Sequence, residues 1–310
     1  MSTENGLQTD LPELFPGFRA GLVEGEGAEI FCRIGGSGPP VLLLHGYPQS
    51  HAMWHPIAAR LAAEFTVVAA DLRGYGASSA PRGDDGHVLY SKRAMGADMV
   101  RMMERLGFQR FAVVGHDRGG RVAYRMGFDH PDRLTRVAVL DILPTYAYWA
   151  RMDWRYGMRM YHWMFLAQPK PMPERLIAGD SIAYLEHTLA SWTKAKDLSA
   201  FDPRALEHYR AFYRQEARIH AVCEDYRAGA TVDMAQDTAD REAGRKIKVP
   251  LLSIYGEAGF GGGERSPAEV WGEWAQEVEA VGVDAGHFLI EEAPQATYAA
   301  LRPFLAKDIQ

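Results

Sequence analysis

Short apolar runs, separated by stretches with helical spacing, recur along this chain of 310 residues. Runs of this kind, bounded by polar segments, are typical of buried strands in a parallel sheet. They lie at 41–44, 66–70, 111–114, 137–140, 251–254 and, more weakly, 278–283. Helical patterns begin between them at Ser91 and Gly119, and a last one begins near Pro294. The alternation predicts an α/β fold, with a mostly parallel sheet and helices on both faces.

The alternation stops between residues 146 and 228, where the pattern is helical and rich in aromatic residues and methionine. Four of the seven tryptophans fall in this stretch. We interpret it as a helical cap, 146–228, inserted into a core made of 1–145 and 229–310. The alternative is a second ordinary core. Because binding sites favour such junctions, we expect a site where cap and core meet.

The stretch VVGHDRGGR, at 113–121, has the spacing of a nucleophile elbow, but Asp117 stands where serine is usual. An elbow is a tight strand-to-helix turn that lifts one side chain clear of the sheet. Here the motif follows an apolar strand and opens a helical pattern, as an elbow requires. Glycines at 115 and 119 allow close packing of the turn. We therefore predict that Asp117 is a nucleophile.

Three further pieces follow in the order expected around an elbow. The loop after the first strand could offer the backbone N–H of Tyr47 to an oxyanion, together with that of Arg118. Asp141 ends the strand at 137–140 and is the predicted acid. His287 lies late in the chain and is the predicted base. Glu257, after the strand at 251–254, is the rival for the acid.

Arg118 and Arg121 lie three residues apart at the start of the same predicted helix. Positive charges there oppose the helix dipole, at a cost of about 0.3–1 kcal/mol each when exposed. An anionic ligand would reverse that balance, and a carboxylate fits a guanidinium in bidentate fashion. The alternative is ordinary surface ion pairing. We predict that this pair binds a carboxylate.

A carboxylate nucleophile suits displacement at a saturated carbon better than acyl transfer. It would leave an ester on the enzyme, which water activated by histidine would then hydrolyse. This chemistry needs no metal or organic cofactor.

Cys32 and Cys223 have no metal or disulfide spacing and are expected to be reduced.

Several motifs make the chain resemble the fluoroacetate and haloacetate dehalogenases of the α/β-hydrolase superfamily, over nearly its whole length. They are HGYPQ at 45–49, DLRGYGAS at 71–78, GHDRGGRVAYR at 115–125, LDILPT at 140–145, HW at 162–163, CEDYRAGA at 223–230 and GHF at 286–288. The resemblance implies an α/β-hydrolase fold with a cap, a homodimer, and cleavage of a short 2-haloacid, best expected to be fluoroacetate, giving glycolate and halide.

The resemblance also implies roles for residues of the cap and of its junction with the core. Arg118 and Arg121 would bind the substrate carboxylate. His162, Trp163 and Tyr226 would form the halide pocket, since each offers an N–H or O–H donor. Trp192, Tyr148 and Tyr47 are expected to form the pocket wall. Tyr47 stands where the resemblance predicts phenylalanine, which leaves pocket size and halogen preference open.

Other functions remain as alternatives. A soluble epoxide hydrolase shares the aspartate and histidine but would use a pair of cap tyrosines, of which Tyr226 could be one. A haloacid dehalogenase could prefer chloro- and bromo-substrates. A haloalkane dehalogenase typically has tryptophan after the nucleophile, where this chain has Arg118. A ligand-binding protein without catalysis is the alternative from another class.

Charge and hydropathy restrict the partners. The formal net charge is −6, which disfavours a general nucleic-acid surface but not a local anion site. No apolar run is long enough to span a membrane, and the N-terminal residues do not resemble a signal peptide. We therefore expect a cytoplasmic protein that binds a small anionic haloacid.

Overall fold

The computed structural model describes residues 11–260 and 265–307. Within them the strands form one sheet with the order β1-β2-β4-β3-β5-β6-β7-β8. The strands are β1 Arg19–Glu24, β2 Glu29–Gly35, β3 Pro40–Leu44, β4 Thr66–Ala70, β5 Phe111–His116, β6 Leu134–Leu140, β7 Leu251–Gly256 and β8 Val278–Val283. The six predicted runs are β3 to β8, so the predicted α/β fold with its mostly parallel sheet is confirmed.

Strands β3 to β8 are parallel, whereas β2 pairs antiparallel with both of its neighbours, β1 and β4. The sequence analysis did not predict β1 and β2. Strand β1 lies at the sheet edge and all of its residues are at least partly exposed, so it has no continuous apolar run. Strand β2 is mostly buried but includes Arg33, which interrupts its apolar pattern.

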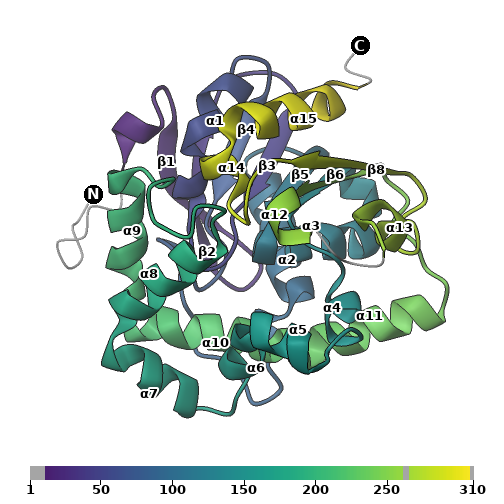
Figure 1. Ribbon diagram of the computed structural model, residues 1–310. Coiled ribbons are helices and arrows are strands. Elements are labelled where there is room, and N and C mark those ends of the chain that lie inside the picture. The colour runs from purple at the N-terminus through teal and green to yellow at the C-terminus, as the bar shows by residue number, and fades with distance from the viewer. Residues whose placement is uncertain (1–10, 261–264, 308–310) are drawn as a thin grey trace.

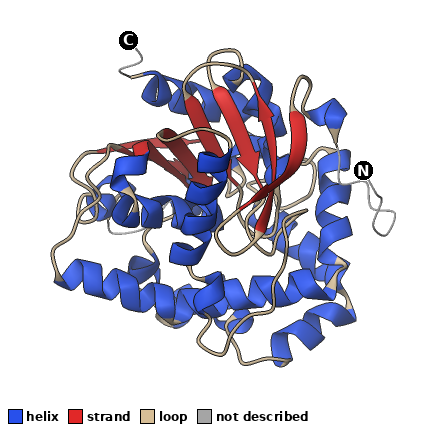
Figure 2. Ribbon diagram, turned by 180° about the vertical axis from the view of Figure 1, so that it is seen from behind, coloured by secondary structure: helices blue, strands red, loops and turns tan. Residues whose placement is uncertain are grey.

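Helices cover both faces of the sheet (Figures 1 and 2). Helix α1 packs against α15, and α2 packs against α3. These four helices span α1 His55–Leu61, α2 Lys92–Arg105, α3 Asp117–Asp129 and α15 Pro294–Ala306. Shorter helices are α12 Glu257–Phe260, α13 Pro267–Trp271, α14 Leu289–Glu292 and the 3₁₀ turns η1 Pro12–Leu14, η2 His51–Trp54, η3 Val88–Tyr90 and η4 Pro131–Arg133.

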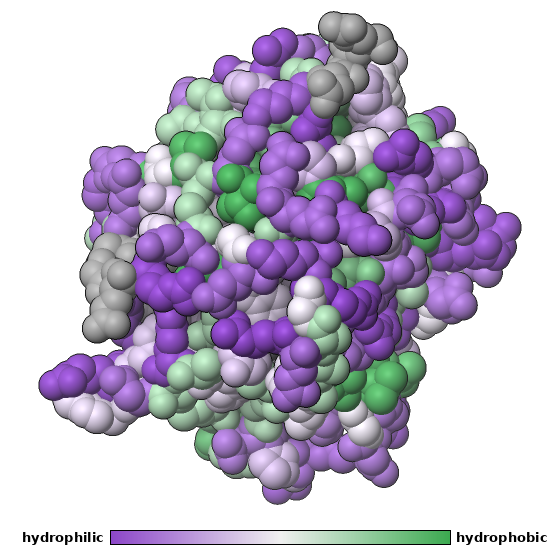
Figure 3. Space-filling view, turned by 90° about the vertical axis from the view of Figure 1, so that its right-hand side faces the viewer, coloured by the Kyte–Doolittle hydropathy of each residue, from purple (hydrophilic) through white to green (hydrophobic). Residues whose placement is uncertain are grey.

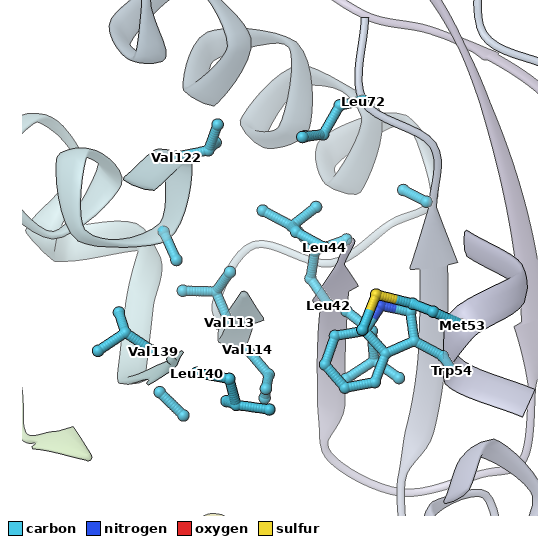
Figure 4. Close-up of a cluster of buried hydrophobic side chains, with 14 of the residues drawn as sticks. Leu42, Leu44, Met53, Trp54, Leu72, Val113, Val114, Val122, Val139 and Leu140 are labelled. Atoms are coloured by element: carbon cyan, nitrogen blue, oxygen red, sulfur yellow. The ribbon is translucent and has the colours of Figure 1, made fainter. Parts of the chain in front are cut away.

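The centre of the sheet is packed with branched aliphatic side chains (Figure 4). One buried cluster includes leucines of β3, valines of β5 and β6, and Val122 of α3. Burying one such side chain fully contributes about 1.5–3 kcal/mol. This packing fixes the carboxyl ends of β3, β5 and β6, from which Tyr47, Asp117 and Asp141 follow in the chain.

The segment between β6 and β7 consists of helices joined by loops, and none of its described residues belongs to a strand. Its helices are α4 Thr145–Trp149, α5 Trp154–Arg159, α6 Tyr161–Leu166, α7 Met172–Gly179, α8 Ser181–Trp192, α9 Pro203–Tyr213, α10 Glu216–Ala230 and α11 Val232–Glu242. Aspartate side chains cap α5, α8 and α9 at Asp153, Asp180 and Asp202, each accepting a backbone N–H of the first turn. Helices α5, α6, α7 and α10 lie below the sheet in Figure 1. The division into a core and a cap at residues 146 and 228 stays a prediction.

Polar side chains cover most of the face that carries α11 and α13, and hydrophobic ones gather there only in small groups (Figure 3). Among the helices described, none combines the length and apolar character that a membrane span requires.

Candidate active site

The elbow places Asp117 at the first residue of α3, directly after β5. Its φ is +44°, a left-handed conformation that non-glycine residues adopt at a cost. The turn is too tight for side chains at its glycines. A Cβ on Gly115 would lie 2.2 Å from the Gly119 carbonyl oxygen, and one on Gly119 would lie 2.4 Å from that of His45. The sequence thus folds into a turn that presents the Asp117 carboxylate.

One oxygen of this carboxylate is already held by the loop after β3. The backbone N–H of Tyr47 donates to Asp117 Oδ1 at 2.9 Å. The other oxygen, Oδ2, lies 3.8 Å from Nε2 of His287. The two oxygens therefore have different surroundings, and Oδ2 is the one without a backbone donor among the hydrogen bonds of the described residues.

Asp141 and His287 are brought together although they lie 146 positions apart in the chain. Asp141 Oδ2 is 2.5 Å from Nδ1 of His287, and Oδ1 accepts the N–H of Gly256 at 2.8 Å. The His287 backbone N–H in turn donates to the Trp192 carbonyl at 2.9 Å. Glu257, the rival acid, is exposed. The His287 imidazole therefore donates its Nδ1 hydrogen bond to Asp141, not to Glu257.

Burial and charge act against each other on these groups. Burial favours a neutral Asp117, but the charges of His287, His116 and the two arginines outweigh it and lower the pKa of the carboxyl group. Burial also favours a neutral His287, but its hydrogen bond to Asp141 and the charges of Asp141 and Asp117 raise the pKa of the imidazole. Burial raises the pKa of Asp141, and His287 opposes that shift. Asp117 is thus kept ionised as a nucleophile must be.

Arg118 is not free to bind a ligand with its whole guanidinium group. Its Nε and Nη2 donate to the Asp225 carboxylate at 3.0 and 2.7 Å, and Nη2 also donates to the Asp225 carbonyl at 2.7 Å. Asp225 further accepts the Tyr75 hydroxyl at 2.7 Å and is ion-paired with Lys92. Arg118 Nη1 is buried and has no hydrogen-bond partner among the described residues. Only that nitrogen remains for a ligand.

Arg121 differs from Arg118 in its partners. Its Nη1 donates to the Leu143 carbonyl at 3.1 Å and to the Thr145 hydroxyl at 3.0 Å, both neutral acceptors. Its Nε is buried without a hydrogen-bond partner, and no carboxylate lies within ion-pairing distance among the residues described. The guanidinium stacks over the rings of Tyr148 and Trp163, at 4.7 and 4.4 Å. Arg121 is therefore a buried cation whose charge lacks an ion-pair partner.

The predicted halide-binding residues form one aromatic cluster. The Tyr226 ring lies 5.8 Å from that of His162 and 6.0 Å from that of Trp163, measured between centroids. The Tyr226 hydroxyl and His162 Nδ1 are buried, and neither has a hydrogen-bond partner in the described part of the chain. Burial lowers the pKa of His162 to about 3, so the ring is neutral.

A cavity of about 1010 Å³ opens at Asp117. Its lining includes the three catalytic candidates, Arg121 and four aromatic side chains. They are Asp117, Asp141, His287, Arg121, His162, Trp163, Trp192 and Tyr148. Trp192 lies against the rings of His162 and His287, at 4.4 and 5.3 Å, and Tyr148 stacks on Trp163 at 5.0 Å.

Arg118, Tyr226 and Tyr47 are not among the residues that line this cavity. They contact its lining instead: the Arg118 guanidinium lies 4.2 Å from the Tyr226 ring, and Tyr226 packs on the cavity-lining His162. The Tyr47 hydroxyl is 3.0 Å from that of Tyr213. The oxygen that phenylalanine would lack at this position therefore has a hydrogen-bond partner inside the protein.

Two neighbours of the site escaped the sequence analysis. Asp225 holds Arg118, and its only signal was an acidic residue next to Tyr226 in the motif CEDYR. The His116 ring lies against that of His287, tilted by 49° with centroids 4.6 Å apart, and its Nε2 lies 2.8 Å from the His287 carbonyl. Burial, then the charge of His287, lowers the pKa of His116 to about 3. A neutral His116 therefore donates to that carbonyl and supports the base.

The described residues include no group of three or more histidine, cysteine, aspartate or glutamate side chains placed to hold a metal ion.

Comparison with known proteins agrees with this geometry. The chain is 45% identical over 294 residues to a fluoroacetate dehalogenase from Burkholderia sp., covering 94% of this chain and 95% of that protein. It is 31% identical over 274 residues to a soluble epoxide hydrolase from Corynebacterium sp. (strain C12), covering 87% and 91%. A crystal structure from Nostoc sp. PCC 7120, provisionally described as an alpha/beta hydrolase, is 47% identical, with a TM-score of 0.91 over 94% of this chain and 99% of that one. Residues 39–294 match the alpha/beta hydrolase fold family. This chain therefore belongs to that family, and it is a hydrolase.

Proposed function

We propose that the protein hydrolyses the carbon–halogen bond of short 2-haloacids, with fluoroacetate as the best substrate, through an ester on Asp117. The observation that carries the proposal is a buried carboxylate nucleophile beside Arg121, a buried cation without an ion-pair partner in the described structure. A haloacid supplies both missing elements, a carbon for Asp117 and a carboxylate for Arg121. The 45% identity to a fluoroacetate dehalogenase supports the same reaction.

In the first step Asp117 Oδ2 attacks the carbon that bears the halogen. A C–O bond forms, the C–halogen bond breaks, and its electron pair leaves with the halide. The Tyr47 N–H holds Oδ1, which leaves Oδ2 as the attacking atom. His162, Trp163 and Tyr226 would donate hydrogen bonds to the leaving halide, and Arg121 with Nη1 of Arg118 would hold the substrate carboxylate.

In the second step water attacks Cγ of the Asp117 ester. His287 takes the proton of that water, and Asp141 stabilises the imidazolium that forms. Negative charge develops on Oδ1, beside the N–H of Tyr47. Collapse of this intermediate breaks the Cγ–Oδ2 bond and releases glycolate, which keeps Oδ2 as its hydroxyl oxygen and takes the remaining proton of the attacking water. The Asp117 carboxylate is restored with one oxygen from that water, and His287 then loses its proton to solvent.

The test is to stop the reaction at the ester. A His287→Ala variant should still displace halide once but should not hydrolyse the ester. After chloroacetate treatment its intact mass should rise by one carboxymethyl group, carried by the peptide that contains Asp117. The Asp117→Ala/His287→Ala double variant is the control and should remain unmodified. Stoichiometric halide release from a His287→Ala protein whose mass does not change would contradict the mechanism.

Epoxide hydrolysis is the second candidate, because the Tyr226 hydroxyl has no hydrogen-bond partner among the residues described and would donate to an epoxide oxygen. The 31% identity to a soluble epoxide hydrolase favours the same possibility. A panel of fluoroacetate, chloroacetate, bromoacetate and styrene oxide, scored for halide and diol, separates the two. It also decides whether fluoro- or chloro- and bromo-acids are preferred.

A further inference from the structure

The cavity is much larger than a two-carbon acid needs. Pockets for drug-sized ligands have volumes of about 300–1,000 Å³, and this one holds about 1010 Å³. It runs from Asp117 past α4 and α5 to residues near α11, α12 and α13. A two-carbon substrate at Asp117 would therefore leave most of the cavity unfilled, and we call the part away from the reacting groups the outer compartment.

That outer compartment is strongly basic. Away from the reacting groups, six basic and two acidic side chains line the cavity, an excess of four positive charges, although the whole chain has a net charge of −6. The basic residues are Arg151, Arg155, Arg159, Lys196, Arg241 and Arg265, and the acidic ones are Asp153 and Glu273.

The charges of this compartment are only partly neutralised. Glu273 pairs with both Arg241 and Arg265, at 2.8 and 2.7 Å. The other four cations have no ion-pair partner among the described residues, and we name them the entrance cations: Arg151, Arg155, Arg159 and Lys196.

The contacts of the entrance cations are with neutral groups. Arg155 lies 4.6 Å from the Trp154 ring, Arg159 donates to the Gly259 carbonyl at 2.7 Å, and Lys196 donates to the Ser191 carbonyl at 2.8 Å. Arg159 also ends α5, where its charge suits the helix dipole. The helix dipole therefore gives a structural reason for the charge of Arg159. It gives no such reason for the charges of the other three entrance cations.

We propose that the entrance cations gather small organic carboxylates at the mouth of the cavity, so that they lower the KM of anionic substrates without acting in the chemical step. Several like charges around one low-dielectric opening raise the local concentration of counter-ions. Because these side chains are at least partly exposed, dissolved salt should screen them, with a Debye length of about 10 Å at 0.1 M. The proposal rests on the proposed function only for the statement that the bound carboxylate is a haloacid.

The test replaces three entrance cations by neutral residues and measures the effect on KM. The same number of exposed cations outside the cavity is replaced for comparison. The entrance variant is Arg151→Gln/Arg155→Gln/Lys196→Gln, which leaves the bond of Arg159 to Gly259 intact. The matched control is Arg19→Gln/Arg175→Gln/Lys248→Gln, which changes the net charge equally at exposed side chains that do not line the cavity. Equal melting temperatures and circular dichroism spectra would show that both variants fold.

With chloroacetate at low ionic strength, the entrance variant should have a KM raised about 5- to 10-fold, the low end of electrostatic steering effects, with kcat within about twofold of the original. Sodium sulfate should abolish the difference. The control variant should keep the original KM, and neutral chloroacetamide should not distinguish the two variants. Equal KM values for the entrance and control variants would overturn the proposal.

Glycolate binding, followed by calorimetry at two ionic strengths, gives a measurement that needs no turnover. Weaker binding only to the entrance variant supports the proposal even if the protein releases no halide, in which case the proposed function alone fails. Glycolate binding that is equal in both variants, or absent from all the proteins, would overturn the proposal that the entrance cations gather carboxylates. Halide release would then decide the proposed function independently.

Discussion

Two sets of groups at the site differ in how their polar atoms are satisfied. The core side is Asp117, Asp141 and His287, where Asp117 Oδ1, both oxygens of Asp141 and Nδ1 of His287 have hydrogen-bond partners within the protein. The cap side is His162, Trp163 and Tyr226 of the predicted cap, where the Tyr226 hydroxyl and His162 Nδ1 are buried without a partner in the described residues. Nη1 of Arg118 and Nε of Arg121, both on α3, are unpartnered in the same way. An unpaired buried polar group costs about 1–3 kcal/mol.

That contrast separates two tasks. In the proposed mechanism the core side orients a nucleophile and a base before any ligand arrives, so its hydrogen bonds belong to the folded state. The cap side and the two arginines keep donors whose partners come only with a ligand, so their free energy becomes available when that ligand binds or develops charge. Changes on the core side should therefore affect all substrates, whereas changes on the cap side or at the arginines should affect substrates unequally.

The largest effect should come from the core side. Asp141→Asn should slow ester hydrolysis by about 10⁴-fold, as loss of the orienting acid does in related triads, because the imidazolium of His287 loses its stabilising charge. Single-turnover decay of the ester, with every haloacetate tested, provides the measurement.

Glu257→Gln is the matched control for this change, since Glu257 is exposed and His287 Nδ1 is bonded to Asp141 instead. Its ester should decay within a few-fold of the original rate. A larger loss in Glu257→Gln than in Asp141→Asn would transfer the role of the acid to Glu257.

Substitutions that affect the two arginines should also lower activity, but to different extents. Arg121→Gln should lower kcat/KM for chloroacetate by about 10²-fold, in line with about 1.5–3 kcal/mol for a hydrogen bond to a charged group, and should change chloroacetamide turnover little. Steady-state kinetics with both substrates measures the difference.

Asp225→Asn tests the other arginine without touching the substrate. It should weaken chloroacetate binding less than Arg121→Gln does, because Arg118 keeps its position through the Asp225 carbonyl. A loss in Asp225→Asn that equals or exceeds that of Arg121→Gln would show that Arg118, rather than Arg121, dominates carboxylate binding.

On the cap side, Trp163→Phe should lower fluoroacetate displacement by about 10²–10³-fold, by analogy with loss of one oxyanion donor, but bromoacetate displacement by much less. Fluoride is small and strongly hydrated, so it needs donors as it leaves, whereas bromide needs less help. Phenylalanine keeps a ring for Arg121 and Tyr148 to stack on. Rapid-quench detection of the ester compares the two rates, and equal losses would mean that Trp163 acts through packing.

The same contrast explains what the sequence could predict. Asp117, Asp141 and His287 follow strands, and their order along the chain made them recognisable. Asp225 could not be assigned to Arg118, because the two meet only through packing of α10 on the core, 107 positions apart. The entrance cations are likewise scattered over residues 151–196, and only the fold places them around one opening. Strands β1 and β2 lacked an apolar run because the sheet edge leaves β1 partly exposed and Arg33 interrupts β2.

The smallest expected effect is a difference between two pKa values of His287. In the free enzyme its hydrogen bond to Asp141 and the charges of Asp141 and Asp117 raise the pKa of the imidazole against the effect of burial. Esterification makes Asp117 neutral and removes one of these causes, so the pKa should be lower in the intermediate. A base must be neutral to act, so ester hydrolysis should be lost as pH falls. The loss should occur at a lower pH than the His287 pKa measured in the free enzyme by NMR.

The control is Asp117→Asn, which removes the same charge without forming an ester. It should lower the pKa of His287 measured by NMR in the same direction. If the variant and the original protein titrate together, the Asp117 charge does not set the pKa of His287, and these two groups are less coupled than the 3.8 Å between Oδ2 and Nε2 suggests.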